Sequence, residues 1–406
     1  MNHAFAVFAL LCLCVTGTFW SADDVWDLFE HLGGDGPFVR LRRHAHPPAL
    51  PPDCRVANVQ GLFRHAERFP TLTAGHRHKA MLQRLRGAAK LRGPLGFIND
   101  YEYFAEEADL EGLTTEGPYA GTRNALRTGK SFAQSYAQLV DSTSILATDN
   151  PRVYDSARYF AAGYGASKVV VVNESEEACE VTLTPPKRCQ RYRTDPIHGH
   201  DYGHQQLLRF SSTYLPRIAE RLHEASGWKF LSSEIYGMQE LCAFETNARG
   251  ASSFCGLFTH DEWEDFEYAR DLKHTYRSGY GNPYGAVMGA PLLRRVHTRL
   301  QSRESSFSFM HDGDLVPLIV ALGLFVDEEL LPTSRKVVSR KWRSTRLVPM
   351  NARIVFERVE CKQSVFIRVI INEGLVMEVP SAQFSALVDA RIGGLNFTQT
   401  CMYADR

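Results

Sequence analysis

Short apolar runs separated by turn residues mark the strands that the sequence predicts. These runs lie at residues 54–62, 144–148, 168–173 and 307–310. Between them, apolar positions recur with helical spacing, which predicts helices over residues 76–91, 118–140, 153–163 and 315–325. Strands and helices that alternate in this order are typical of an α/β fold with a mostly parallel central sheet flanked by helices.

The pattern changes in three other parts of the chain. Residues 185–300 are mostly helical without a convincing strand, so we interpret them as an inserted all-α lobe. The α/β catalytic domain is then expected to comprise residues 53–184 and 301–406. Turn residues dominate residues 23–52, which predicts an irregular N-terminal arm. The end of the chain predicts a hairpin and a helix, at residues 351–361, 364–372 and 381–391.

The amino terminus has the features of a secretory signal peptide. Residues 4–15 form an apolar run that is too short to cross a bilayer, which takes about 20 residues. Small residues follow near Ala22, so we expect a signal peptide over residues 1–22 and a secreted or cell-wall protein. Glycosylation sequons at Asn173 and Asn396 agree with export. No later segment is long and apolar enough to cross a membrane, so we do not expect the membrane as a partner.

Cysteine usage also agrees with export. Two of the nine cysteines lie in the predicted signal peptide. The others are Cys54, Cys179, Cys189, Cys242, Cys255, Cys361 and Cys401. They contain no Cys-x-x-Cys pair, so a zinc site is not expected. In an oxidising compartment they predict three disulfides and one unpaired thiol, and the sequence alone leaves the pairing open.

Charge and composition narrow the class of partner. The 406 residues include 46 basic and 46 acidic side chains, so the formal net charge is zero. A balanced chain gives no reason to expect nucleic acid as the partner. The hydrophobic content of 44% suffices for a large core.

Polar side chains follow three of the predicted strands. They are Arg64, His65 and Arg68 after the first strand, Arg152 after the second, and His311 with Asp312 after the last. The carboxyl ends of parallel strands meet at one edge of a sheet, where α/β proteins bind ligands. One imidazole can attack phosphorus, arginines can hold the phosphoryl oxygens, and one carboxylic acid can protonate the leaving oxygen. This set predicts phosphoryl transfer without a metal or another cofactor.

Other chemistries are less well supported. His260 and Asp261 follow Thr259, which has capping-box spacing to Glu262, so a structural role is favoured for that pair. A second group of histidines, which would suggest a metal, lies among glycines in a predicted loop: His198, His200 and His204. The phosphate-cradling Gly-x-x-x-x-Gly-Lys motif and the Gly-x-Ser-x-Gly elbow are both missing from the sequence. Asp314 is a plausible N-cap for the helix over 315–325.

The segment after the first predicted strand is similar to a known signature. Arg64-His65-Ala66-Glu67-Arg68-Phe69-Pro70 resembles the Arg-His-Gly-x-Arg-x-Pro motif of the histidine acid phosphatases, and His311-Asp312 resembles that family's second motif. The segments at residues 31–37, 255–263 and 281–285 resemble the secreted fungal branch, which holds phytases and yeast-type acid phosphatases. The similarity covers nearly the whole chain after the predicted signal peptide. It implies a phosphoglycerate mutase-like fold.

The resemblance also implies roles for single residues. His65 would be the nucleophile that becomes phosphohistidine, and Asp312 would protonate the leaving alcohol. The phosphoryl group would be bound by Arg64, Arg68, Arg152 and His311. The implied disulfides are Cys54–Cys361, Cys189–Cys401 and Cys242–Cys255, which leaves Cys179 over.

Two departures leave alternatives open. Ala66 stands where the family has glycine, so an inactive relative that binds phosphate esters without turnover is the opposing reading. Phytate, a highly anionic inositol phosphate, would profit from the cations Lys273 and His274. Glu67 puts a negative charge into the motif, which favours a broad acid phosphatase over a phytase. We therefore expect a small phosphate monoester as substrate, with an inositol phosphate as the alternative.

Overall fold

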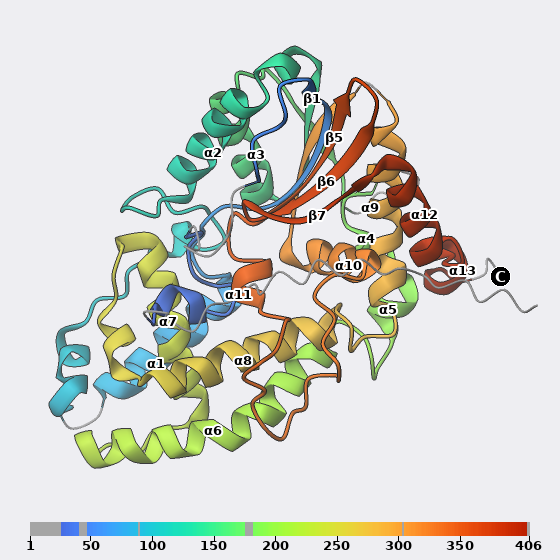
Figure 1. The fold of residues 1–406 in the computed structure, drawn as a ribbon. Helices are drawn as coiled ribbons and strands as arrows, with labels where there is room; N and C mark the ends of the chain where they lie inside the picture. Colours follow the sequence, from blue (N-terminus) through green and yellow to red (C-terminus); the bar gives the residue numbers. More distant parts are fainter. Residues whose placement is uncertain (1–25, 40–46, 88–89, 175–181, 303, 404–406) are drawn as a thin grey trace, which may run out of the picture.

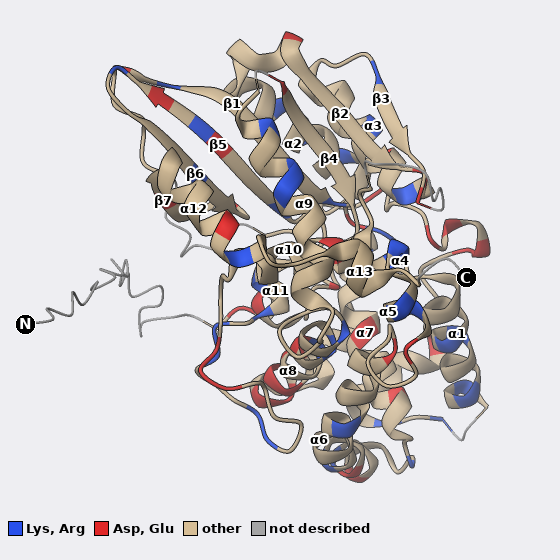
Figure 2. Ribbon diagram, turned by 90° about the vertical axis from the view of Figure 1, so that its right-hand side faces the viewer, with Lys and Arg blue, Asp and Glu red and all other residues tan. Residues whose placement is uncertain are grey.

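The computed structural model describes residues 26–39, 47–87, 90–174, 182–302 and 304–403. The predicted signal peptide and Cys179 lie outside these residues. Within them, no helix is both long and apolar enough to cross a membrane. Acidic and basic residues are interleaved along strand β5 and over the helical part of the molecule (Figure 2).

A seven-stranded mixed sheet forms the centre of the α/β part, in the order β3-β2-β4-β1-β5-β6-β7. The strands are β1 (Cys54–Arg64), β2 (Thr143–Thr148), β3 (Val169–Val172), β4 (Ser305–Met310), β5 (Arg353–Cys361), β6 (Val365–Ile371) and β7 (Gly374–Pro380). The four strands from β3 to β1 are parallel, and β5, β6 and β7 extend the sheet antiparallel. The predicted α/β class and the predicted C-terminal hairpin are both confirmed.

Helices cover both faces of this sheet (Figure 1). One face packs on α2 (Gly121–Ser135) and α3 (Pro151–Tyr164), and the other on α9 (Gly285–Leu300), α10 (Asp312–Leu322) and α12 (Ser381–Ile392). Alternation along β1 explains the two cores. Leu62 packs into the cluster on the α10 side, whereas Phe63 packs on the α3 side against Phe160 and Phe309.

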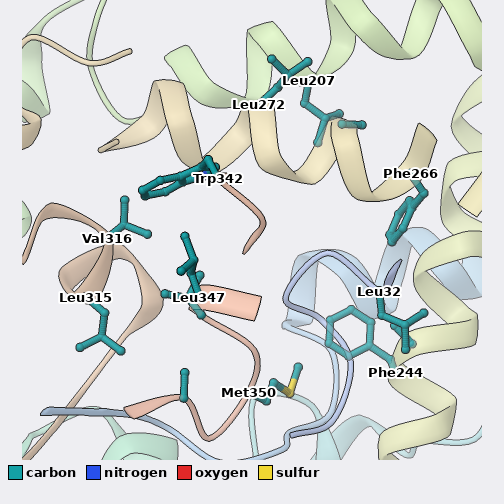
Figure 3. Packing of buried hydrophobic residues seen from close by; sticks show 14 of the residues in the cluster. Leu32, Leu207, Phe244, Phe266, Leu272, Leu315, Val316, Trp342, Leu347 and Met350 are labelled. Carbon is teal, nitrogen blue, oxygen red and sulfur yellow. The ribbon is translucent and has the colours of Figure 1, made fainter. Parts of the chain in front are cut away.

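A group of helices lies at the carboxyl edge of the parallel strands (Figure 1). It contains α1 (Leu72–Arg86), α6 (Tyr202–Ser226), α7 (Ser232–Arg249) and α8 (His260–Arg277), with short helices α4 (Pro185–Arg188) and α5 (Gln190–Thr194) nearby. One apolar core joins these helices to the sheet, since Phe244 and Leu272 belong to the same cluster as Leu62 of β1. Figure 3 shows part of this cluster. No strand occurs in the described part of residues 185–300. The division into a catalytic domain and a lobe stays a prediction.

Two details of the helix starts differ from the sequence predictions. Helix α1 begins at Leu72 rather than near residue 76, because the Thr71 side chain accepts the Ala74 N–H and caps the helix. Asp314 is not the N-cap of α10. That position belongs to His311, whose backbone N–H donates to Asp314 Oδ2 at 3.0 Å.

Among the described residues, three disulfides join separate segments of the chain. Cys54–Cys361 joins β1 to β5, Cys242–Cys255 closes a turn after α7, and Cys189–Cys401 ties α13 (Phe397–Cys401) to the segment between α4 and α5. These are the pairs that the family resemblance implies. Asn396 is exposed and caps α13, and Asn173 directly follows β3.

Candidate active site

The four parallel strands end beside one cavity of about 1010 Å³. Each strand contributes polar groups at its carboxyl end: Arg64, His65 and Arg68 after β1, Arg152 after β2, Glu174 after β3, and His311 with Asp312 after β4. All of them except Glu174 line the cavity. The structure therefore brings together the six residues that the sequence predicts at the strand ends.

His65 is held as a neutral imidazole with one free nitrogen. Its backbone N–H donates to the Met310 carbonyl at 3.1 Å, and its Nδ1 lies 2.9 Å from the Ala66 carbonyl. Because a carbonyl only accepts, Nδ1 carries the proton and Nε2 keeps its lone pair. Burial and the charges of Arg64 and Arg152 hold the pKa of His65 well below its usual range. The chemistry available to Nε2 is nucleophilic attack.

Three arginines present buried donors around this imidazole. The Nε atoms of Arg64, Arg68 and Arg152 are buried without a hydrogen-bond partner among the described residues. Each unsatisfied buried donor costs about 1–3 kcal/mol, which an anionic ligand would recover. Burial is the main cause that lowers the pKa of Arg68 to about 10, and the charges of the neighbouring arginines add to it. Arg68 therefore stays charged in neutral and acidic solution. This arrangement favours binding of a phosphoryl group.

One terminal nitrogen of each arginine is hydrogen-bonded within the protein. Arg64 Nη1 donates to the carbonyls of Gly34 at 2.5 Å and Val348 at 2.6 Å. Arg68 Nη1 donates to the Phe69 carbonyl at 2.8 Å. Arg152 Nη1 donates to Glu111 Oε2 at 2.6 Å. Anchoring of this kind limits the entropy that the guanidinium groups lose when an anion binds.

Asp312 lies beside the first arginine. Its Oδ2 is 3.7 Å from Arg64 Nη2 and 3.8 Å from His274 Nε2. Burial alone would raise the pKa of Asp312, but the charges of Arg64 and Arg277 hold it well below its usual range. In the free protein this carboxyl group is therefore ionised.

Ala66 fits the site without backbone strain. It is absent from the described non-glycine residues with positive φ, its N–H donates to Ser156 Oγ at 2.9 Å, and its methyl group packs against Leu113 and Ala125. Glycine is not required at a position with ordinary φ and room for a methyl group. Alanine at this position therefore gives no physical reason to expect an inactive motif.

Glu67, which we expected to influence specificity, does not reach the cavity. Its side chain is fully buried, does not line the cavity, and accepts the Phe38 N–H at 2.9 Å. Burial raises the pKa of Glu67 in spite of that hydrogen bond. The Glu67 side chain thus faces the N-terminal segment, and the motif alone does not reveal this direction.

The two cations predicted to contact phytate differ in position. Lys273 lines the cavity, and the charge of Arg270, together with burial, lowers its pKa to about 7. His274 does not line the cavity and is 1% exposed. Burial also holds the pKa of His274 well below its usual range.

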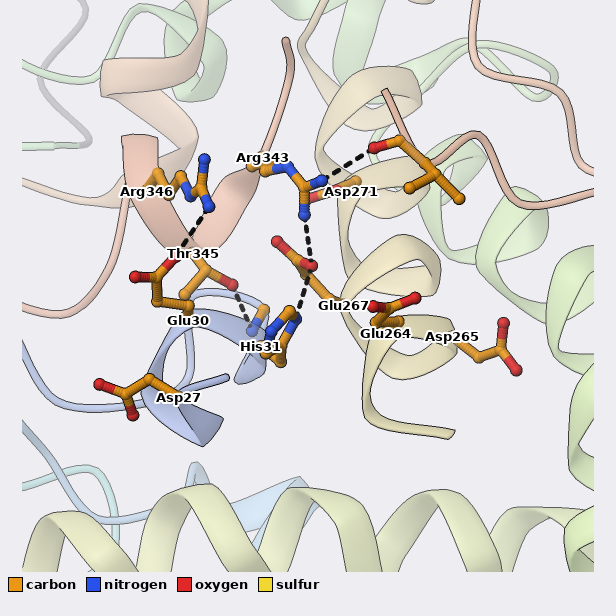
Figure 4. Close-up of polar contacts among 12 residues, drawn as sticks. Asp27, Glu30, His31, Glu264, Asp265, Glu267, Asp271, Arg343, Thr345 and Arg346 are labelled. Carbon is orange, nitrogen blue, oxygen red and sulfur yellow. Dashed lines mark hydrogen bonds and ion pairs between the residues drawn. The ribbon is translucent and has the colours of Figure 1, made fainter. Parts of the chain in front are cut away.

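Several residues of the site were not predicted from the sequence. Asp35 lies in the cavity wall and pairs with Arg270 at 2.8 Å, although the predicted N-terminal arm carried no expected function. A network involving His31, Glu267 and Arg343 fastens this arm to α8 (Figure 4). Further cations line the cavity, namely Arg77, Lys187, Arg193 and Arg277. Helix charges of this kind are ordinarily solvated, so only the fold identifies them.

The alternative pair at His260 and Asp261 follows a helix cap, whereas His200 and His204 of the second group line the cavity. Thr259 accepts the Glu262 N–H as the N-cap of α8, and Glu262 accepts the Thr259 N–H, so the predicted capping box is confirmed. His260 stacks on Trp26, away from the cavity. Among the described residues, no three His, Cys, Asp or Glu side chains gather into a group that could hold a metal ion.

Comparison with known proteins agrees with this geometry. Residues 55–372 match the family model of the histidine phosphatase superfamily (branch 2). Phytase PHO112 of Candida albicans is 31% identical over 93% of this chain and 87% of its own. Acid phosphatase PHO1 of Komagataella pastoris is 30% identical over 87% and 80% of the two chains.

Solved structures share the fold. The crystal structure of the phytase from D. castellii has a TM-score of 0.86 at 25% identity, and the match covers 92% of this chain and 88% of that one. The multiple inositol polyphosphate phosphatase of Bifidobacterium longum, solved in complex with inositol hexasulfate, has a TM-score of 0.60 at 13% identity over 86% and 93% of the chains.

Proposed function

Because the chain belongs to branch 2 of the histidine phosphatase superfamily, we propose that it hydrolyses phosphate monoesters as an acid phosphatase. The reaction would pass through a phosphohistidine on His65. One observation carries the proposal. Nδ1 of His65 donates its proton to the Ala66 carbonyl in a hydrogen bond, so Nε2 holds a lone pair in a cavity lined by buried arginines.

In the first step, Nε2 of His65 attacks phosphorus and the bond between phosphorus and the ester oxygen breaks. Asp312 gives its proton to the leaving oxygen, which departs as the alcohol. Arg64, Arg68 and Arg152 hold the equatorial oxygens while charge shifts towards the leaving group. In the second step, water attacks the phosphohistidine, Asp312 takes up its proton, and inorganic phosphate leaves with His65 restored.

The charge state of Asp312 supports an acidic working range. Its carboxyl group is ionised in the free protein, because Arg64 and its neighbours overcome the effect of burial. A bound phosphoryl group places negative charge beside Arg64, which weakens this stabilisation and raises the pKa of Asp312. The proton then comes from acidic solvent or from the monoanionic form of the ester.

A phytase is the second candidate, and the cavity lining favours it. Beyond the phosphoryl clamp, the cavity presents Arg77, Lys187, Arg193, Lys273 and Arg277. One phosphoryl group does not need so many cations, whereas an inositol hexakisphosphate would contact several at once. The volume of about 1010 Å³ suffices for such a ligand. Glu67, turned away from the cavity, no longer argues against it.

We also propose that the protein is exported and glycosylated. The three disulfides suit an oxidising compartment. The apolar run at residues 4–15 supports a signal peptide. Exposure of Asn396 leaves its sequon accessible to glycan transfer.

An activity profile tests the proposed function. Hydrolysis of an aryl phosphate is measured from pH 3 to 8, with and without a chelator, for the wild type and His65→Ala. We expect activity confined to acidic and weakly acidic solution, insensitive to the chelator, and lowered by about 10³-fold or more in His65→Ala. Loss of activity with the chelator, or undiminished turnover in His65→Ala, would overturn the proposal.

A further inference from the structure

Glu174 connects the edge strand β3 to the active site. Its backbone N–H donates to Asp149 Oδ1 at 3.1 Å, and its side chain is 11% exposed. One carboxylate oxygen lies 3.0 Å from Nε2 of His311, and the other pairs with Lys187. An acid outside both sequence motifs therefore holds one of the expected phosphoryl-binding groups.

This contact fixes the proton on His311. Burial alone would raise the pKa of Glu174, but hydrogen bonds from His311 and Lys187 lower it to about 2. The ionised carboxylate only accepts hydrogen bonds, so Nε2 of His311 must carry a proton. The nitrogen of His311 that remains for a phosphoryl oxygen is Nδ1.

A neutral His311 cannot donate from Nδ1, because its single proton is on Nε2. Its Nδ1 lone pair would face the negative phosphoryl oxygens and repel them. Donation to the phosphoryl group therefore needs a second proton on the ring. The resulting imidazolium would lie between two anions, the carboxylate of Glu174 and the bound phosphoryl group, and both stabilise its charge.

We propose that Glu174 is a positioning residue that couples phosphoryl binding at His311 to the uptake of a proton. The proposal rests on the proposed function of the site. Glu174 orients the ring, fixes its tautomer and supplies the charge that stabilises the imidazolium. Its place at the end of β3 means that all four parallel strands contribute to the phosphoryl site.

Other charges surround His311 and set the direction of the effect. The titratable and charged groups that face it are Glu174, Lys187, Arg152, His65 and Asp314. Burial lowers the pKa of His311, Glu174 opposes this, and Arg152 and Lys187 lower it further. His311 is thus neutral in the free protein above its lowered pKa. Binding of a phosphoryl group raises that pKa, so the ring takes up a proton.

The test compares the full-length wild type with Glu174→Gln. The probe is inorganic phosphate, and calorimetry near pH 6 in two buffers of different ionisation enthalpy measures the protons taken up on binding. In parallel, nitrogen NMR of ¹⁵N-labelled histidine reports the tautomer of His311, whose signal is assigned with His311→Gln. Glu304→Gln is the matched control, because this acid precedes the opposite end of β4 and its carboxylate is exposed.

We expect neutral His311 in the wild type to carry its proton on Nε2. Proton uptake should fall in Glu174→Gln by up to about one proton relative to the wild type, and Glu304→Gln should match the wild type. Equal proton uptake in Glu174→Gln and the wild type, or a proton on Nδ1 in neutral wild-type His311, would overturn the proposal. Failure of the proposed function has a different signature. The wild type would then hydrolyse no ester, while the NMR result on the tautomer would stand.

Discussion

The carbonyl oxygen of Gly34 accepts a hydrogen bond of 2.5 Å from Nη1 of Arg64. Gly34 belongs to the N-terminal segment, thirty residues ahead of the motif that it supports. The same segment binds a second cavity arginine, because the Gly33 carbonyl and the Asp35 carboxylate both accept from Arg270. The N-terminal turn is thus part of the wall that positions the cationic groups.

Substitution of Gly34 should therefore weaken anion binding. Its φ of +82° favours glycine, and an added Cβ would lie 3.3 Å from the Val348 carbonyl. We expect Gly34→Ala to cost about 1–2 kcal/mol in strain, to lower the melting temperature, and to raise KM for an aryl phosphate severalfold. Gly394→Ala is the control, since a Cβ there meets no atom within 4 Å. Wild-type KM and melting temperature in Gly34→Ala would contradict this role.

Asp312→Asn should affect substrates according to their leaving groups. An amide cannot protonate the leaving oxygen, so an alkyl phosphate should lose about 10²–10⁴-fold in kcat. A nitrophenyl phosphate should lose much less, because nitrophenolate leaves without a proton. The ratio of the two rates, measured in wild type and variant at acidic pH, checks this. An equal loss for both esters would show that Asp312 acts by another route.

Lys273 should matter for multiply phosphorylated substrates. Its pKa, lowered to about 7 by Arg270 and burial, leaves it charged in acidic solution and neutral above that value. Binding that depends on its charge is therefore present below pH 7 and is lost as the pH rises through 7. We expect Lys273→Met to raise KM for phytate by about tenfold at pH 5 and to leave KM for an aryl phosphate nearly unchanged. Equal changes for both substrates would refute this selectivity.

Ala66→Gly should not improve the enzyme. The backbone at Ala66 has ordinary φ, and its methyl group fills a small apolar pocket. Glycine there increases the freedom of the unfolded chain and removes a buried methyl group. We therefore expect Ala66→Gly to lose about 1 kcal/mol in unfolding free energy. Its kcat should stay within about twofold of the wild type. Chemical denaturation and steady-state kinetics measure both quantities. A large rise in kcat would restore the view that alanine impairs the motif.

The residues at the strand ends explain why much of the site was predictable. The apolar runs before His65, Arg152 and His311 identify strands, and parallel strands end at a common edge. Local pattern therefore places these groups together without any knowledge of the fold. The same reasoning could have flagged Glu174, which follows the strand predicted at residues 168–173. No motif marks it, and its partner lies more than a hundred residues away.

Other features depend on directions and distances that a linear pattern does not contain. The side chain of Glu67 lies away from the cavity and accepts the Phe38 N–H, and the motif gives no sign of this. Asp35 reaches Arg270 across more than two hundred residues of sequence. Helix α8 presents Lys273 to the cavity and buries His274, and only the packing of α8 against α6 and its other neighbours decides between the two adjacent positions.

The covalent intermediate provides the most direct test of the proposed mechanism. A ³²P-labelled monoester is mixed with the enzyme and quenched in denaturant within milliseconds, and the site of the label is mapped by peptide analysis. We predict label on His65, stable to base and lost in acid, and none in His65→Ala. An acid-stable label on serine, or burst kinetics without any labelled protein, would contradict attack by Nε2 of His65.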